Sequence, residues 1–309
     1  MNHWAINLGA NDGATSDPVV ELYHNGWHGV AVELESQFCD RLTQNLDSAH
    51  VAIHCPVPAT PLNIQTLLQG VPVDMDYLKI DIDSYDCDVL ASIMNAGYRP
   101  KVIQMETGTI PPPVRFASHY HDSYSRPHAQ IYQAFGCSLS YVDDLLSQFG
   151  PHKYELIEAS LDSIWVRSDI LKTSSSHITS TDAFQPLEAF RSPLTAYVNG
   201  FWRYPWRREL HVWEIGTEHW FQLEKDEDRM IAIEEHMTCV ESCFHSKYAP
   251  FDYTLQLGPM NGPFKGSNPE TDYLKLDQKD QEEEEEDDDD VEGMSRSHMD
   301  PDDVGAFSD

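Results

Sequence analysis

The stretch Ile6–Gly13, "INLGANDG", sets the fold that the rest of the sequence has to fit. The apolar run that begins at His3 ends at Gly9, and a second glycine, Gly13, follows four residues later. This pattern predicts a strand whose exit turns sharply and lets a ligand come close to the backbone. Taken alone, these eight residues are equally consistent with an ordinary turn, so the neighbouring sequence has to decide.

Apolar runs alternate with amphipathic stretches over the first 168 residues. The runs predict strands, and the stretches between them predict helices of 10–12 residues. Such an alternation implies right-handed crossovers and a mostly parallel, buried sheet. The predicted strands are His3–Leu8, Gly29–Leu34, His50–Cys55, Asp76–Asp83 and Lys101–Glu106, and the predicted helices are Ser16–Asn25, Gln37–Leu46, Pro61–Gly70 and Asp86–Ala96.

The pattern changes after the fifth strand. Residues 107–135 are rich in Pro, His and Tyr and predict a loop, and residues 138–150 carry the apolar face of a helix. Residues 154–167 then predict two strands joined by a tight turn. This terminal hairpin breaks the parallel order, so the sheet is expected to end in an antiparallel strand.

Composition divides the chain into four predicted parts. Residues 1–168 form the α/β domain, and residues 169–182 are a polar linker. Residues 183–265 are an aromatic-rich extension of uncertain fold. Residues 266–309 are a low-complexity acidic tail, which has too little apolar surface to offset the entropy of ordering and is expected to be disordered.

The charge is extreme, at −32, and seventeen of the 52 acidic residues lie in residues 271–309. The remainder of the chain is acidic as well. An acidic protein surface repels phosphate backbones and anionic lipid surfaces, so nucleic acid and membranes are not expected partners. No segment of about twenty apolar residues predicts a membrane span. The tail offers a surface for basic protein partners.

The six cysteines are mostly scattered singly and do not resemble a disulfide framework. The N-terminus lacks a basic region followed by an apolar core, so we expect no secretory signal. A reducing compartment, the cytoplasm, is the resulting prediction.

An acid at the end of the second strand changes the reading of the glycine loop. Glu33 lies twenty residues after Gly13, and an acid at that place can accept hydrogen bonds from both hydroxyls of a ribose. Backbone N–H groups of the loop and the following helix N-terminus can face a carboxylate or phosphate. The pair predicts a nucleoside-containing cofactor. It is not a dinucleotide fingerprint, because G-x-G-x-x-G is absent, and no G-K-[ST] follows.

Four segments, "INLGANDGATS", "VAVELE", "DYLKIDIDSYDCDVL" and "PKVIQMETGTIPP", resemble in order and spacing the FkbM-type S-adenosylmethionine-dependent methyltransferases. The resemblance covers about residues 3–168. It implies a class I methyltransferase fold: a doubly wound, mostly parallel, Rossmann-like sheet of seven strands, ending in an antiparallel hairpin strand. It also implies S-adenosyl-L-methionine as cofactor.

The resemblance further implies which residues bind the cofactor. Gly9, Asn11 and Gly13 would wrap its methionine end, and Glu33 would bind its ribose. Asn7 stands where the family usually has an acid that holds the amino group of the cofactor. The acid often found after the third strand, near the adenine, is replaced by "HCPVPATP".

The fourth strand ends in a group of acids, "KIDIDSYDCD". Asp81 and Asp83 point to one face of the predicted strand, and Glu106 ends its neighbour. These carboxylates could bind the cofactor or substrate, or they could bind Mg²⁺ or Ca²⁺, which prefer oxygen ligands. Alternatively, Asp83 or Asp86 caps the following helix while Asp81 faces the cofactor. Asp88 is expected to be a solvated helix residue, and no metal ligand is assigned.

Methyl transfer needs the acceptor held in line and a base to remove its proton. The candidate catalytic residues are Asp81, Asp83, His119 and His121, the histidines lying in a possible substrate lid; they could equally be exposed loop residues without a role. The leading hypothesis is O-methylation of a hydroxyl or carboxylate on a small molecule or glycan. The alternatives are a non-catalytic binding or trafficking protein that keeps the fold, and a metal-dependent enzyme that uses the acidic cluster.

Overall fold

The structure is a computed structural model that describes residues 2–14, 17–46, 50–107, 110–121, 135–159, 162–173, 220, 223, 225–244, 252–260 and 264. Contacts divide the chain into two units, Met1–Pro269 and Glu270–Asp309, and every described residue belongs to the first. The predicted acidic tail and most of the predicted linker therefore lie outside the described residues. The boundaries of the four predicted parts stay predictions. Among the described residues, no helix has the length and apolarity needed to span a bilayer.

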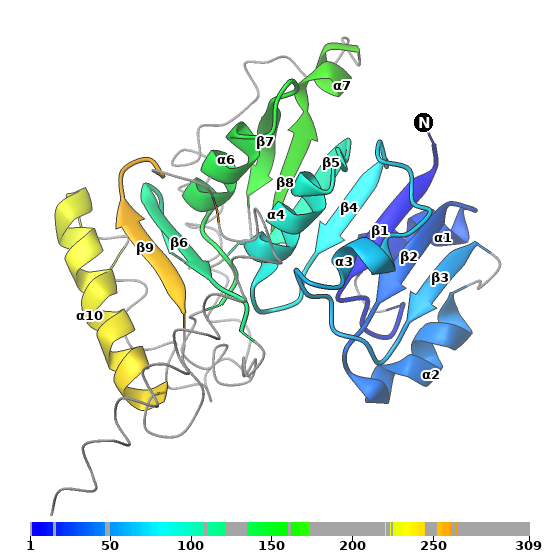
Figure 1. The fold of residues 1–309 in the computed structure, drawn as a ribbon, viewed down its shortest axis with the longest axis horizontal. Helices are drawn as coiled ribbons and strands as arrows, with labels where there is room; N and C mark the ends of the chain where they lie inside the picture. The colour runs from blue at the N-terminus through cyan, green and yellow to red at the C-terminus, as the bar shows by residue number, and fades with distance from the viewer. Residues whose placement is uncertain are drawn as a thin grey trace, which may run out of the picture. The chain divides into compact units, whose positions relative to one another are not determined.

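Seven strands form one sheet in the order β3-β2-β1-β4-β5-β8-β7 (Figure 1). The first five strands along the chain pair in parallel, and β8 pairs antiparallel with both β5 and β7. This order and the antiparallel terminal strand confirm the class I methyltransferase fold. The strands are β1 Trp4–Leu8, β2 His28–Val32, β3 Val51–His54, β4 Tyr77–Ile80, β5 Val102–Glu106, β7 Tyr154–Ala159 and β8 Asp162–Arg167.

Helices cover both faces of the sheet because successive side chains of a strand point to opposite faces. In β1, Ala5 packs in a cluster with α1 and α2, whereas Ile6 and Leu8 pack in the main core with α3, α4 and α6. Both faces are therefore apolar, as a parallel sheet requires. The helices are α1 Pro18–His24, α2 Ser36–Asn45, α3 Ile64–Leu67, α4 Asp86–Asn95 and α6 Leu139–Ser147.

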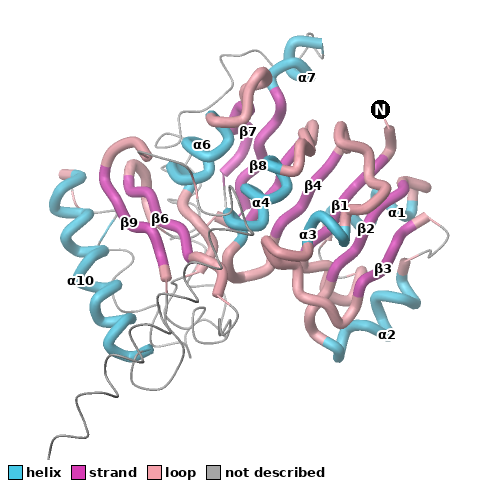
Figure 2. Tube along the Cα trace, in the orientation of Figure 1, coloured by secondary structure: helices cyan, strands magenta, loops and turns pink. Residues whose placement is uncertain are grey.

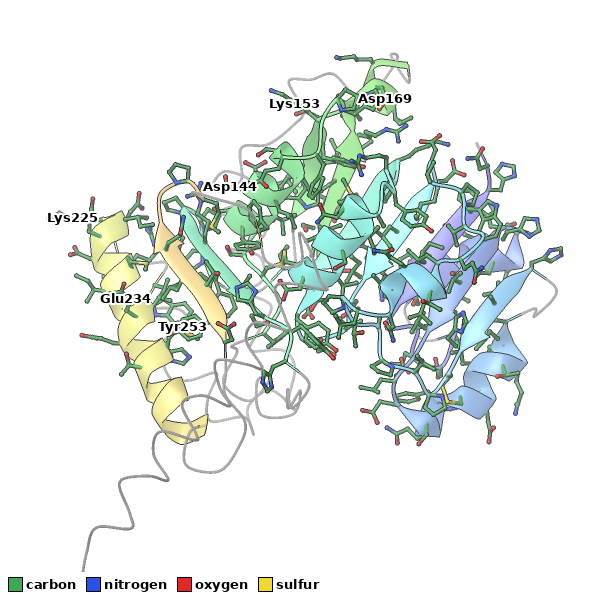
Figure 3. The ribbon with its side chains drawn as sticks, in the orientation of Figure 1. Asp144, Lys153, Asp169, Lys225, Glu234 and Tyr253 are labelled. Atoms are coloured by element: carbon green, nitrogen blue, oxygen red, sulfur yellow. A yellow bond between two sulfur atoms is a disulfide. The ribbon has the colours of Figure 1, made fainter. Side chains whose placement is uncertain are left out.

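The predicted loop after β5 contains a strand that the sequence pattern did not indicate. β6, Val114–Ser118, pairs antiparallel with β9, Tyr253–Leu257, from the predicted extension (Figure 2). Helix α10, Asp226–Phe244, packs against this two-stranded sheet through Ile233 and Met237. On the other side, Arg115 Nε of β6 donates to Asp144 of α6 at 2.8 Å (Figure 3). A short helix, α7 Ser168–Thr173, follows β8.

The prediction that the cysteines form no disulfides is wrong. Cys39 of α2 is bonded to Cys55 after β3, and Cys87 of α4 is bonded to Cys137 before α6, with Cα atoms 5.5 and 6.1 Å apart. Cysteines scattered in sequence can meet in space, and spacing alone does not reveal it. Because disulfides persist in oxidising compartments, the prediction of a reducing, cytoplasmic location loses the support it was given.

Gly9 and Gly70 provide a matched pair for testing how the first loop is packed. Both have φ of +87°, but a β-carbon at Gly9 would lie 1.8 Å from the Asp81 carbonyl oxygen, whereas one at Gly70 meets no heavy atom within 4 Å. Gly70→Ala should cost only the left-handed backbone penalty, roughly 1–2 kcal/mol. Gly9→Ala should cost about 3 kcal/mol or more. Urea unfolding measures both, and equal losses would contradict the close approach of β1 and β4.

Removing each disulfide in turn should destabilise the fold unequally. The two bonds span 16 and 50 residues, and the longer loop restrains the unfolded chain more. Paired Cys→Ser changes should cost about 3 kcal/mol for Cys39 and Cys55 and about 4 kcal/mol for Cys87 and Cys137. Urea unfolding without reductant checks this. Unchanged stability in both variants, or more than two reactive thiols among the six cysteines of the denatured wild type, would contradict the pairing.

Candidate functional site

The strand order reverses at β1, and this reversal places the candidate site at the carboxyl end of the sheet. From β1 the chain winds outward through β2 and β3, then returns to β4 on the other side of β1. In open α/β sheets, ligands bind at such a reversal, beyond the carboxyl ends of the strands. Here that position is flanked by Glu33 after β2 and by Asp81 after β4.

Packing between protein segments explains the two glycines of the first loop, Gly9 and Gly13. The N–H groups of Gly9 and Ala10 both donate to the Val32 carbonyl at 3.0 Å. A β-carbon at Gly9 would strike the backbone of Asp81, and one at Gly13 would lie 2.9 Å from the Leu42 side chain of α2. The glycines therefore let protein segments approach one another, and their predicted contacts with a cofactor stay predictions.

Glu33 holds the first loop in place. Its side chain is nearly buried, 6% exposed, and its two carboxylate oxygens accept from the backbone N–H groups of Asn11 at 2.8 Å and Glu35 at 2.7 Å. Asn11 has a left-handed backbone, φ 49°. Each carboxylate oxygen can accept a second hydrogen bond, and the binding of a ribose by Glu33 stays a prediction.

Asn7 is part of a buried polar network that explains why it is not an acid. Its Nδ2 donates to Asp17 Oδ2 at 2.7 Å, and its Oδ1 is buried without a hydrogen-bond partner in the described part of the chain. Asp17 also accepts from the Val19 N–H, capping α1. An acid at position 7 would place two carboxylates side by side, which the Asn7 amide avoids by donating to Asp17.

Lys79 connects this network to Asp81. Its Nζ lies 2.9 Å from Asp81 Oδ2 and 3.7 Å from Asp17 Oδ2, and its side chain is buried. Sequence reasoning missed both Asp17 and Lys79. The available signals were a capping Asp before Pro18 and a lysine inside an apolar strand, since a buried lysine is almost always paired.

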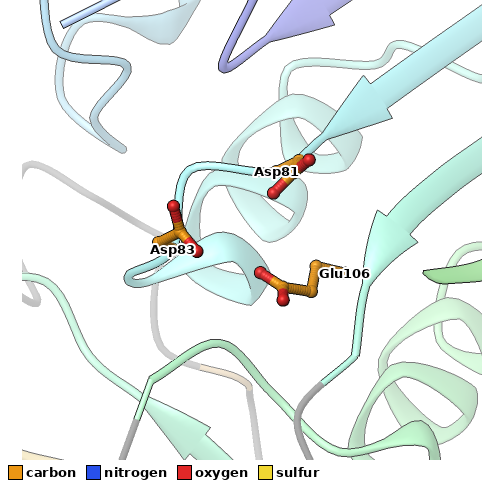
Figure 4. Close-up of side chains that lie close together, drawn as sticks. All are labelled: Asp81, Asp83 and Glu106. Carbon is orange, nitrogen blue, oxygen red and sulfur yellow. The ribbon is translucent and has the colours of Figure 1, made fainter. Parts of the chain in front are cut away.

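Three carboxylates converge where β4 and β5 end (Figure 4). Asp81, Asp83 and Glu106 each offer an oxygen, and these oxygens lie within 4.8 Å of one another. The spacing could accommodate a divalent cation, although exposed acidic groups often cluster without one. Asp86 is oriented differently: it accepts from the N–H groups of Ile82 and Ser84 and so fixes the loop that carries Asp83.

The crowding of acids changes their proton affinity. Burial, followed by the charges of neighbouring acids, raises the pKa of Glu106 well above its usual range. Burial also raises the pKa of Asp86 to about 7, against the opposing effect of its two backbone hydrogen bonds. Burial raises the pKa of Asp81 as well, with Lys79 opposing the shift. The site therefore holds negative charge at a cost that a bound cation would relieve.

His119, one of the predicted bases, is enclosed. Its Nδ1 lies 3.0 Å from Asp88 Oδ1 and its Nε2 lies 2.7 Å from Thr254 Oγ1, and the residue is 1% exposed. Asp88 also accepts from the Tyr120 N–H. The expectation that Asp88 is solvated is wrong, because it is fully buried and anchors this segment to α4. His121 is partly exposed, and its predicted role stays a prediction.

The segment after β5 is fastened to the loop that carries Asp83. The Ser84 carbonyl accepts from the Gly136 N–H and the Ser118 hydroxyl, both at 2.5 Å. The Cys87–Cys137 disulfide adds a covalent link at the start of α4. These contacts set one wall beside the acidic cluster.

A separate cavity lies at the opposite end of the sheet. It has a volume of about 570 Å³ and is lined by residues at the ends of α1 and α2 and before β3, including Tyr23, Asn45 and His50. Because these helices run opposite to the parallel strands, their last residues lie at the amino edge. This cavity is therefore distinct from the site with the acids.

Comparison with known proteins adds little to this geometry. No family model matches the chain, and no curated protein matches it. A crystal structure of a fibrillarin/Nop5p complex is similar over 54% of this chain and 72% of that chain, at 13% identity and a TM-score of 0.33. A Methanococcus jannaschii fibrillarin pre-rRNA processing protein is similar over 54% of this chain and 68% of that chain, at 12% identity and a TM-score of 0.31. The fold assignment rests on the strand order, because scores this low carry no argument.

Moving the carboxylate from residue 17 to residue 7 tests the buried network. Asn7→Asp should destabilise the protein by about 2–4 kcal/mol near neutral pH, since two carboxylates would then adjoin in a buried place. Adding Asp17→Asn should restore stability to within about 1 kcal/mol, because Asn also caps helices. Chemical denaturation of the three proteins measures this. The network would be contradicted if Asn7→Asp left stability unchanged, or if the double variant were no more stable than Asn7→Asp alone.

Proposed function

We propose that the chain binds S-adenosyl-L-methionine at the carboxyl ends of β1, β2 and β4 and methylates a hydroxyl or carboxylate oxygen of a small molecule or glycan, like the FkbM-type enzymes that its sequence resembles. The supporting observation is the arrangement around β1. The loop after β1 lies between Glu33 and Asp81, on either side of the strand where the chain order reverses.

The charges of these residues suit the cofactor. When bound, it supplies a methyl group on a positively charged sulfur and carries an ammonium group. Glu33 would bind the ribose, and the loop with Gly9, Asn11 and Gly13 would surround the methionine end. Asp81, Asp83 and Glu106 together present carboxylates that attract cations. The buried Oδ1 of Asn7 is an unused acceptor beside this site.

The chain's contribution to methyl transfer is mainly positioning and proton removal. Asp81 keeps about a third of its side chain exposed, and together with Asp83 it remains a candidate base. His119 is poorly suited in this arrangement, because both ring nitrogens already have partners. The segment after β5, fixed to Ser84 by two hydrogen bonds, is the proposed wall of the acceptor site.

A second candidate is a binding or trafficking protein that keeps the fold without catalysis. The replacement of the acid expected near the adenine by "HCPVPATP" favours it. Cofactor binding without methyl transfer in a broad acceptor screen would support this reading over the first. The acidic tail as a surface for basic protein partners remains part of either proposal.

Isothermal titration calorimetry with S-adenosylmethionine and S-adenosylhomocysteine tests the proposal. We expect both to bind with dissociation constants below about 1 mM. Glu33→Gln should weaken binding by about tenfold, since charge-assisted hydrogen bonds are lost. Glu21→Gln, at an exposed acid of α1, serves as the control and should bind like the wild type. No heat at millimolar ligand would overturn the proposal.

A further inference from the structure

We infer that Glu106 is the proton acceptor of the site: it carries a proton when no cofactor is bound, releases it when the cationic cofactor arrives, and takes the proton of a hydroxyl acceptor during transfer. This inference rests on the proposed function. It narrows the acceptor to a hydroxyl, because a carboxylate acceptor has no proton to lose.

The geometry distinguishes Glu106 from the other acids. It is the last residue of β5, beside the end of β4, and its carboxylate lies within 4.8 Å of those of Asp81 and Asp83 (Figure 4). Asp81 is paired with Lys79, and Asp86 is held by two backbone N–H groups. Glu106 has neither kind of partner: within the described residues its side chain makes no hydrogen bond or ion pair. It is partly exposed, so an acceptor could reach it.

The charges around Glu106 are almost all negative. Asp81 and Asp83 face it from the loop after β4, Asp86 from α4 and Asp162 from β8. The neighbouring cation is Lys79 on β4, and it lies against Asp81 and Asp17. Burial and these acids raise the pKa of Glu106, so the neutral acid is favoured when no positive charge lies beside it. A bound positive charge reverses this preference and drives the proton off.

The resulting step conserves charge within the site. The hydroxyl oxygen of the acceptor forms a bond to the methyl carbon, and the electrons of the broken carbon–sulfur bond stay on sulfur, which becomes neutral. Glu106 takes the hydroxyl proton and becomes neutral at the same time. One positive and one negative charge disappear together, and the proton then exchanges with water.

Proton linkage tests this without any knowledge of the acceptor. Calorimetric titrations with S-adenosylmethionine and with neutral-sulfur S-adenosylhomocysteine are run with EDTA in buffers of different ionisation enthalpy. We expect the cationic cofactor to release up to about one proton more than the neutral product. From pH 6 to 8, its affinity relative to that of the product should rise by up to about tenfold per pH unit.

Glu106→Gln should remove both the extra proton and the pH dependence while still binding the two ligands. Glu234→Gln changes an exposed acid of α10 (Figure 3) and should behave like the wild type. Equal proton release for both ligands, or an extra proton that persists in Glu106→Gln, would overturn the inference while leaving cofactor binding intact. Absence of binding heat for either ligand would overturn the proposed function and this inference with it.

Discussion

The contact between Gly9 and the Asp81 carbonyl is the constraint on which the site depends. Residue 9 leaves β1 where a β-carbon would lie 1.8 Å from that oxygen, so β1 and β4 leave the sheet side by side. The loop after β1 and the acids after β4 consequently lie beside each other. Glu33 fixes the other side of the same loop through the Asn11 N–H. Gly9, which the close packing of β1 against β4 requires, thus determines which charged groups lie beside each other.

The charges around this site determine which ligands it favours. Asp81, Asp83 and Glu106 meet with Lys79 as the neighbouring cation, and Lys79 also lies near Asp17 beneath the loop. Buried carboxylates without enough positive charge are destabilised and take up protons. A cationic ligand would therefore be favoured by charge, and a phosphate-bearing ligand would be repelled. The acidity of the whole chain acts in the same direction.

Much of the fold could be predicted because it follows from short-range patterns. Periodicity located β1–β5 and the helices between them, although the helix predicted at Pro61–Gly70 forms only over Ile64–Leu67. The strand predicted to reach Asp83 ends at Ile80, so Asp83 lies in the following loop. Right-handed crossovers implied a parallel sheet, and Glu106 could be placed beside Asp81 by the alignment of strand ends. The pairing of β6 with β9 could not be predicted, because Val114 and Leu257 lie far apart in the chain. The disulfides and the His119–Asp88 contact likewise depend on where the chain returns in space.

The departure at Asn7 illustrates the limit of reading one residue at a time. It stands where the family that the sequence resembles usually has an acid, but in the structure its Nδ2 donates to Asp17 Oδ2 at 2.7 Å, so the amide has a structural partner of its own. The site as a whole is tested most directly by a crystal structure with S-adenosylhomocysteine. We predict the ribose hydroxyls on Glu33 and the sulfur directed toward Asp81, Asp83 and Glu106. Ligand bound in the cavity beside Tyr23 and His50 at the opposite edge, and none at the carboxyl ends of the strands, would contradict this prediction.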